Sequence, residues 1–280
     1  MIFVSEPNID IKDVASVAEA MRNVQISGNT QIVEQFENMF AAYIGAAYGI
    51  SCNSGASALH IALLSLGIGK GDEVLVPDLT MIATANAVTY CGATPIFIDS
   101  ELDTWGMDST KLEDKITSHT KAVVPVHLYG HPVKMSSIRE VAQKYDLFIV
   151  EDAAEAIGSE YQNKKCGSFG HAGCFSFYAN KNITTGEGGM VVTDDLQIAE
   201  KCRALRSHAF GEKKDLFQHF NHTALGYSYR LSGLQAALGV SQMERVEQLI
   251  EKKCNNGKFY NSFLKDLADQ HMIDLPPQMP

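Results

Sequence analysis

The sequence predicts an α/β fold, a large domain with a mostly parallel central sheet covered by helices. Two observations lead to this fold class. Short runs that are apolar on both faces, as in the strands of a covered parallel sheet, alternate with longer segments whose apolar residues recur every three or four positions. The chain has 280 residues, 45% of them hydrophobic and 20% charged, which is enough to bury a substantial core.

Two amphipathic helices come first along the chain, and strands alternate with helices after them. The two helices are predicted in IDIKDVASVAEAMRN and TQIVEQFENMFAAYIG. Apolar runs bounded by turn residues predict the strands, and periodic segments between them predict further helices. In chain order the strands are YGISCN, DEVLVP, TPIFID, KAVVPVHLYG and LFIVEDA, and the helices between them include GASALHIALLSLGI, TMIATANAVTYC and SSIREVAQKYD.

The alternation changes after Glu160. Two strands, GCFSFYAN and GGMVVTD, are predicted to be joined by the loop that carries Lys181, and the helix LQIAEKCRALRSH follows them. A continuous helical pattern then runs from Ser232 almost to the end, and its Gly257 is either an interruption or a tolerated weak point. The proline-rich ending DLPPQMP has the composition of a linker, so we expect the chain to be cut there.

The bulk composition excludes several classes of protein. A formal net charge of -10 argues against a nucleic-acid partner, because affinity for phosphate backbones depends on clustered Lys and Arg. The six cysteines have no metal-ligand spacing and predict buried thiols in a reducing compartment, with no metal site. No basic leader precedes a long apolar run, and no run is long enough to span a bilayer. The expected location is cytoplasmic, with no membrane partner.

Candidate site residues follow the predicted strands, since ligands of open parallel sheets bind at the carboxyl ends of the strands. Ser54 and Gly55 open a helix whose free N–H groups could bind an anion, and Ser176 could add a hydroxyl to the same anion. The alternatives are a plain N-capped helix for Ser54 and an outward-facing strand residue for Ser176. Thr80 and Met81 open the helix after the second strand, where Met81 is either a cover for a ring-shaped ligand or a core methionine.

Two charged positions have the same two-sided interpretation. Asp152 directly follows an apolar strand and, if it is buried, would need a cation or a protonated nitrogen as a partner. The same sequence is compatible with a helix N-cap at Asp152 that forms a capping box with Glu155. Lys181 lies between an aromatic strand and a glycine-rich turn. Confinement there would lower the pKa of its amine and free it for imine chemistry, whereas an ordinary loop lysine would reach into solvent.

Six longer stretches carry a resemblance that covers roughly residues 1–265. The stretches are NSGASALHIAL, GDEVLVPDLTMIATANAV, PVHLYGHPVKM, EDAAEAIGSEY, CFSFYANKNITTGEGGMVVTD and LGYSYRLSGLQAALGVSQMERV. They resemble the DegT/DnrJ/EryC1/StrS family of nucleotide-sugar aminotransferases, which implies a fold-type I enzyme dependent on pyridoxal 5′-phosphate (PLP). FSFYANKNITTGEGGM, together with Glu155 at a position that is often glutamine in other branches, most resembles the branch that forms GDP-perosamine.

The resemblance assigns a role to each candidate residue. Lys181 would hold PLP covalently and later move a proton, which suits an amine whose pKa is near neutral. Asp152 would pair with the pyridine nitrogen of the cofactor, and Glu155 would lie near its phenolic oxygen. The other implied cofactor contacts are Gly55, Ala56 and Ser176 at the phosphate, and Met81 over the ring.

The sequence departs from the family pattern at three positions. Ala56 stands where many members have Thr, and Met81 stands where an aromatic residue is common. Ser228, in GYSYR, replaces the Asn that reaches the phosphate from a partner subunit in relatives. The segment would still have to reach a neighbouring site, so the resemblance implies a homodimer. Arg230 is either an anchor for a substrate anion or a partner in a surface salt bridge.

The resemblance also implies a reaction and a domain organisation. The expected reaction transfers an amino group from L-glutamate to the 4-keto carbon of a nucleotide-linked 4-keto-6-deoxyhexose, for O-antigen or another surface glycan. A lysine at position 181, where dehydrating relatives carry histidine, favours transamination. The alternatives are a UDP- or dTDP-linked substrate, amination at C3, a non-catalytic regulatory homologue, and an amino-acid lyase. The expected parts are a PLP-binding domain with N-terminal helices at 1–230, a long helix at 231–270, and at 271–280 the start of a C-terminal small domain that is largely missing.

Overall fold

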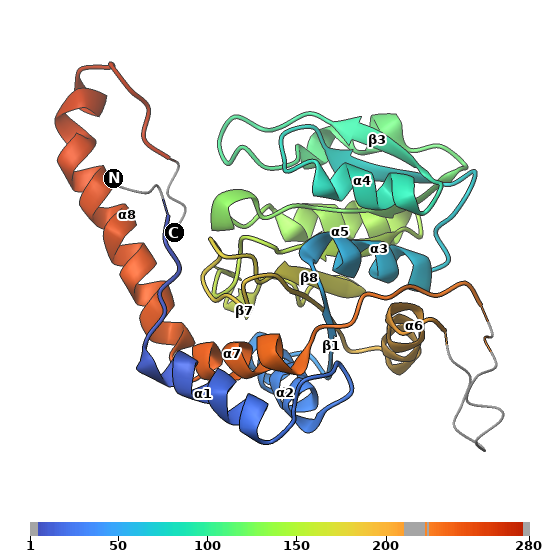
Figure 1. The fold of residues 1–280 in the computed structure, drawn as a ribbon. Helices are drawn as coiled ribbons and strands as arrows, with labels where there is room; N and C mark the ends of the chain where they lie inside the picture. Colours follow the sequence, from blue (N-terminus) through green and yellow to red (C-terminus); the bar gives the residue numbers. More distant parts are fainter. Residues whose placement is uncertain (1–4, 210–221, 223, 277–280) are drawn as a thin grey trace.

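A computed structural model describes residues 5–209, 222 and 224–276 (Figure 1). Seven strands form one sheet in the order β1-β9-β8-β5-β4-β2-β3, in which β9 is antiparallel to both neighbours and the other pairs are parallel. The predicted α/β fold with a mostly parallel sheet is therefore confirmed. The strands are β1 (Tyr48–Cys52), β2 (Glu73–Pro77), β3 (Thr94–Ile98), β4 (Thr120–Val123), β5 (Phe148–Asp152), β8 (Ala172–Ser176) and β9 (Gly189–Thr193).

Eight α-helices surround this sheet in the part of the chain that the structure describes. A small hairpin of β6 (Glu160–Tyr161) and β7 (Lys164–Lys165), which the periodicity did not predict, follows β5. Three single 3₁₀ turns lie at Ser109–Lys111, Glu113–Lys115 and Leu128–Gly130. The helices are α1 (Ile11–Arg22), α2 (Gln31–Ile44), α3 (Gly55–Ser65), α4 (Ala83–Tyr90), α5 (Met135–Lys144), α6 (Leu196–Arg206), α7 (Gly233–Met243) and α8 (Val246–Asp269).

Helices cover both faces of the sheet because successive strand residues point to opposite sides. In β2, Val74 and Val76 are buried in the core that includes α3, α4 and α6, whereas Leu75 belongs to the core that includes α5. A third core joins α2 and α7 to Phe175 of β8, with Phe40 edge-on to Phe175 at 4.9 Å between ring centroids. The strands were predicted to be apolar on both faces, and their residues are indeed buried against helices on both faces of the sheet.

Helix α3 is held by one of these cores, and its burial gives a testable stability. Leu63 is fully buried on α3, whereas Leu102 is 92% exposed. Replacing Leu63 with alanine should lower the free energy of unfolding by about 2–5 kcal/mol, because the change removes buried methyl groups and leaves a cavity. The same substitution at Leu102 should change it by less than about 0.5 kcal/mol. Urea unfolding of both variants measures the difference, and equal values would contradict the assignment of α3 to the core.

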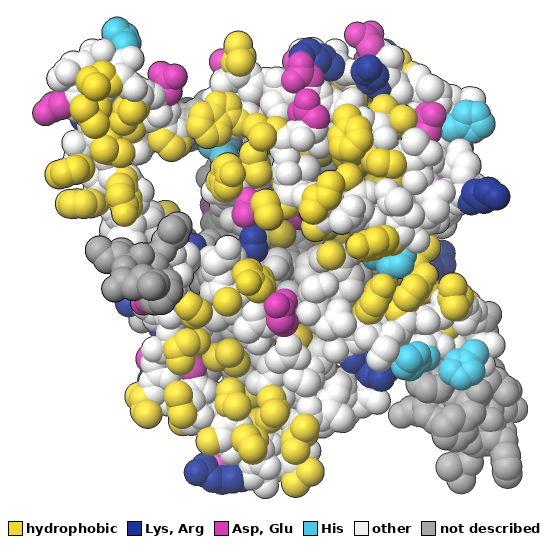
Figure 2. Space-filling model, turned by 45° about the horizontal axis from the view of Figure 1, so that its top comes forward, with side chains coloured by type: hydrophobic (Ala, Val, Ile, Leu, Met, Phe, Trp, Pro, Cys, Tyr) yellow, Lys and Arg dark blue, Asp and Glu magenta, His cyan; other side chains and the backbone are white. Residues whose placement is uncertain are grey.

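The C-terminal helical region differs from the prediction of one long helix. The chain breaks at Glu244 and Arg245, between α7 and α8, while Gly257 lies inside α8 as a tolerated weak point. The break has a tertiary cause. The Arg245 guanidinium turns back to the buried Asp13 carboxylate of α1, 2.5 Å away. Helix α8 then leads away from the sheet (Figure 1), and apolar side chains are exposed at its far end (Figure 2). They include Phe259, Tyr260 and Phe263.

The cysteines agree only partly with the predicted buried thiols. All six are free, and Cys52, Cys166, Cys174 and Cys202 are buried. The prediction is wrong for Cys254, which is exposed because it lies on the projecting α8, and Cys91 is half-buried. Across the described residues, helices with the length and apolarity needed for a bilayer crossing are absent.

Candidate active site

The predicted site residues meet at one edge of the sheet. Strand β5 ends at Asp152, β8 ends at Ser176, and β1 leads into α3 at Gly55. Strands β1, β5 and β8 point the same way, so their carboxyl ends lie at the same edge. The antiparallel return of β9 starts from this edge too, which places the loop with Lys181 beside the strand ends.

Asp152 is a buried carboxylate with specific hydrogen-bond donors. Its side chain accepts the Thr84 hydroxyl at 2.6 Å and the Ala154 N–H at 3.2 Å. The predicted alternative, a capping box with Glu155, is wrong because no helix starts here. Burial raises the pKa of the Asp152 carboxyl, while these two hydrogen bonds and the charges of His127 and Lys181 oppose the rise. A buried carboxylate held in this way is suited to accept a hydrogen bond from a protonated ring nitrogen. Thr84 carries no motif signal in the sequence.

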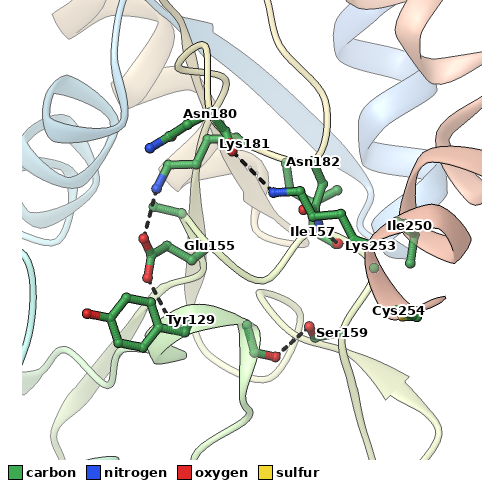
Figure 3. Close-up of a pocket in the computed structure, with 13 residues that line it drawn as sticks. Tyr129, Glu155, Ile157, Ser159, Asn180, Lys181, Asn182, Ile250, Lys253 and Cys254 are labelled. Atoms are coloured by element: carbon green, nitrogen blue, oxygen red, sulfur yellow. Dashed lines mark hydrogen bonds and ion pairs between the residues drawn. The ribbon is translucent and has the colours of Figure 1, made fainter. Parts of the chain in front are cut away.

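Lys181 pairs with Glu155 in a confined position. The two side chains are 14% and 19% exposed, and Nζ of Lys181 donates to Oε1 of Glu155 at 3.1 Å. The other oxygen of Glu155 accepts the Tyr129 N–H at 2.9 Å (Figure 3). Tyr129 has a φ of 52°, a left-handed conformation that is uncommon for a residue with a side chain. The interpretation of Lys181 as an ordinary surface lysine is therefore wrong.

A cavity of about 450 Å³ opens beside this pair. It is lined by Glu155 and Lys181, by Tyr129, and by residues of α8 (Figure 3). Lys253 of α8 donates to the Asn180 carbonyl at 3.3 Å, and burial and the nearby Lys181 lower the pKa of Lys253. The sequence did not single out Lys253, because only the tertiary arrangement brings α8 to this loop.

Gly55 and Ser176 form the part of the site that fits an anion. Ser54 does cap α3, since its hydroxyl accepts the Ser57 N–H at 3.1 Å. The next amides, of Gly55 and Ala56, belong to the first turn and have no partner within the helix. A Cβ on Gly55 would lie 2.9 Å from the Cβ of Ser176, so the missing side chain leaves the helix start open toward the serine. Ser176 is only 9% exposed and is not an outward-facing strand residue.

The close approach of Gly55 to Ser176 leads to a prediction about the affinity for PLP. Gly55→Ala should weaken PLP binding about tenfold to a hundredfold, because the added Cβ would push the helix start away from Ser176, and a hydrogen bond to a charged group is worth about 1.5–3 kcal/mol. Gly69→Ala is the matched control, since nothing lies within 4 Å of its added Cβ. Equilibrium titration of the apo protein with PLP measures both dissociation constants. Equal affinities in the two variants would remove Gly55 from the anion site.

Three other predicted residues make no polar side-chain contact with this cluster among the residues that the structure describes. Met81 is 58% exposed, and the helix begins at Ala83 instead of at Met81, although the Met81 carbonyl accepts the Thr84 N–H. Ser228 pairs with Ser207 in an isolated bridge, and Arg230 packs against Gly28. In the described ranges no hydrogen bond or ion pair joins the three side chains to Asp152 or Lys181. Their cofactor and substrate roles stay predictions.

The residues that do meet have the chemistry that PLP requires. A confined amine, a buried carboxylate and an open helix start with a buried serine lie at one sheet edge, and they fit an aldehyde, a ring nitrogen and a phosphate, respectively. The fold and this site define the class of PLP-dependent transferases. The model of the DegT/DnrJ/EryC1/StrS aminotransferase family matches residues 7–280, and the chain belongs to this family, whose members depend on PLP.

Two curated relatives are each 47% identical to this chain. One is the GDP-perosamine synthase of Caulobacter vibrioides, aligned over 88% of this chain and 66% of its own length. The other is a UDP-N-acetyl-3-dehydro-alpha-D-glucosamine 3-aminotransferase of Acidithiobacillus ferrooxidans, aligned over 86% of this chain and 62% of its own length. The chain therefore spans about two thirds of the length of these relatives.

A solved structure shares the fold. It is GDP-4-keto-6-deoxymannose-3-dehydratase, determined as a variant with bound GDP-perosamine. The TM-score is 0.89 at 26% sequence identity, and the alignment covers 94% of this chain and 73% of that one.

Proposed function

We propose that the protein is a nucleotide-sugar aminotransferase that moves an amino group from L-glutamate to the 4-keto carbon of GDP-4-keto-6-deoxymannose. The observation that carries the proposal is the confined Lys181–Glu155 pair, 3.1 Å apart, at the strand end that also holds the buried Asp152. A relative named GDP-perosamine synthase and a structural neighbour that binds GDP-perosamine support the choice of sugar.

The proposed mechanism divides the work among three side chains. PLP, when bound, supplies an electron sink for the electron pair that a departing proton leaves behind. Lys181 would hold the cofactor through its Nζ and, with that nitrogen free, would move a proton from or to the amino-bearing carbon. Glu155 keeps Nζ in place, because its other oxygen is fixed by the Tyr129 N–H. Asp152, whose carboxylate is fixed by the Thr84 hydroxyl, would keep the ring nitrogen protonated.

The test is amino transfer with a defined acceptor. The protein loaded with PLP should convert L-glutamate to 2-oxoglutarate beyond one equivalent per cofactor only when GDP-4-keto-6-deoxymannose is present to take up the amino group. NMR of the sugar product should place the new amine on C4. Cofactor attachment without any turnover, with every acceptor tried, would favour a non-catalytic regulatory homologue. Turnover of an amino acid without a sugar acceptor would favour a lyase.

A second substrate has support from one comparison. The 3-aminotransferase of Acidithiobacillus ferrooxidans is as similar to this chain as the perosamine synthase is, at 47% identity. A UDP-linked 3-keto sugar is therefore the acceptor to run in parallel, together with a dTDP-linked one. An amine on C3 of a UDP sugar would replace the proposed substrate while leaving the proposed reaction intact.

The proposed setting is a cytoplasmic homodimer that serves the synthesis of O-antigen or another surface glycan. Apolar side chains are exposed near the strand-end edge, between β2 and α4, which suits a surface that is covered by a second copy. They are Leu79, Met81 and Ile82, each 48–69% exposed. Light scattering should give twice the chain mass of 30.6 kDa. A fully active monomer would refute the dimer.

A further inference from the structure

Glu151, the neighbour of Asp152 on β5, is a fully buried carboxylate outside the cavity. Burying a charge is costly unless it is well paired, and Glu151 has four donors. Three are backbone N–H groups, at 2.6–2.8 Å, and the fourth is the ring of His127, whose Nε2 lies 3.0 Å from Oε2. The backbone donors belong to Gly167, Phe169 and Gly170. None of these groups has a place in the mechanism above.

His127 is bound at every polar atom. Its ring is fully buried, and Nδ1 accepts the Val133 N–H at 3.3 Å while Nε2 faces Glu151. Its backbone N–H donates to the Asp152 carbonyl at 3.1 Å, and its carbonyl accepts the Gly130 N–H at 3.1 Å. The ring therefore holds Glu151, and the backbone holds the next residue of the same strand, Asp152.

These contacts extend the sheet beyond its regular pairing. Strand β4 ends at Val123, yet the Asp152 N–H donates to the Pro125 carbonyl at 2.9 Å and Val126 bridges Asp152. Residues 125–127 thus support the last residue of β5. Beside this backbone pairing, the fully buried His127 ring anchors the segment to the protein interior through Glu151.

The same segment leads into the strained turn at Tyr129. Non-glycine residues with positive φ cost about 1–3 kcal/mol and persist where the surrounding contacts fix them. Tyr129 donates its N–H to Glu155, which in turn accepts from Lys181 (Figure 3). His127 closes this turn through Gly130.

We infer that His127, anchored on Glu151, is a positioning residue for two other carboxylates of the site, those of Asp152 and Glu155. It positions Asp152 through the backbone pairing and Glu155 through the Tyr129 turn. The inference deepens the proposed function and rests on it for the catalytic readout only.

The test compares two substitutions of His127 by residues with an amide side chain, glutamine and asparagine. In His127→Gln the side-chain N–H₂ reaches the place of Nε2 and keeps the bond to Glu151, whereas in His127→Asn it is too short to do so. The Asn variant should lose about tenfold to a hundredfold in kcat, with KM changed less than threefold, because misplacement of about 1 Å costs that much. The Gln variant should recover most of the loss. His171→Asn is the control, since His171 binds the opposite end of β5 through the Ile149 N–H.

A readout that needs no turnover separates this inference from the proposed function. Hydrogen exchange of the Tyr129 amide in the apo protein should be fast in His127→Asn and slow in His127→Gln, His171→Asn and the wild type. The visible circular dichroism of bound PLP should change only in His127→Asn. Equal exchange and equal spectra in the Asn and Gln variants would overturn the inference, even if no sugar substrate is ever turned over. A loss of thermal stability shared by His127→Asn and His171→Asn, without these changes, would reduce His127 to a structural role and overturn it as well.

Discussion

Replacing Lys181 with alanine is expected to abolish amino transfer, with kcat reduced about a thousandfold or more. The reason is that one nitrogen both attaches the cofactor and moves the proton, and a positioned general base alone contributes about 10²–10⁴-fold. Borohydride reduction should fix PLP to the wild type and to Lys252→Ala, a lysine on the exposed side of α8, but not to Lys181→Ala. Steady-state assays and the intact mass measure both effects.

Peptide mapping supplies the outcome that would contradict this prediction. The reduced cofactor must be found on the peptide that contains Lys181. Attachment to Lys253, which lines the same cavity, would transfer the role to α8 and would leave the Lys181–Glu155 pair as an ordinary ion pair.

Asp152→Asn is expected to lose about 10²–10⁴-fold in kcat while the apo protein becomes more stable. The amide keeps the size of the side chain and an oxygen for the Thr84 hydroxyl, but it cannot keep a ring nitrogen protonated. A buried, ionised carboxylate costs free energy in the folded state, and the amide removes this cost. Active sites often have this trade between stability and activity.

The stability of the apo protein should depend on pH through Asp152, and the sign of this dependence follows from the direction of its pKa shift. Burial raises the pKa of the folded Asp152 carboxyl above its ordinary value of 3.8. At pH values between 3.8 and the raised pKa of the folded carboxyl, the folded state binds more protons than the unfolded state. The free energy of unfolding therefore falls as the pH rises through this range. Asp152→Asn should lack this fall, and the exposed control Asp103→Asn should retain it. Urea unfolding of the apo proteins across acidic pH measures it. A less stable Asn variant at neutral pH would contradict the burial cost.

Local patterns predicted most of the fold. The alternating apolar runs around β1, β2 and β5 and the direct β8–β9 connection follow from periodicity and turn residues, which act over a few positions. The break between α7 and α8 does not, because Arg245 bends the chain toward Asp13, more than two hundred residues away. The helical sequence pattern around Gly257 gives no indication of the contact between Arg245 and Asp13.

The candidate site divides in the same way. Lys181, Asp152 and Glu155 could be predicted, because each stands next to a strand end or in the loop between two strands. Thr84 and Lys253 could not, since their importance depends on which helix lies beside which loop. The roles of Met81, which is exposed, and of Ser228, whose backbone bridges Ser207, stay predictions.

The reversed strand β9 has a consequence for how the protein is made. It separates β1 from β8, with Tyr48 opposite Thr193, so the earliest strand synthesised finds its neighbour only after the last one has emerged from the ribosome. Gly189 at the start of β9 lies against Ser54, where an added Cβ would meet the Ser54 carbonyl at 2.3 Å. The start of α3 therefore gets its final surroundings only after β9 has been made. A nascent chain that stops short of β9 should not retain PLP.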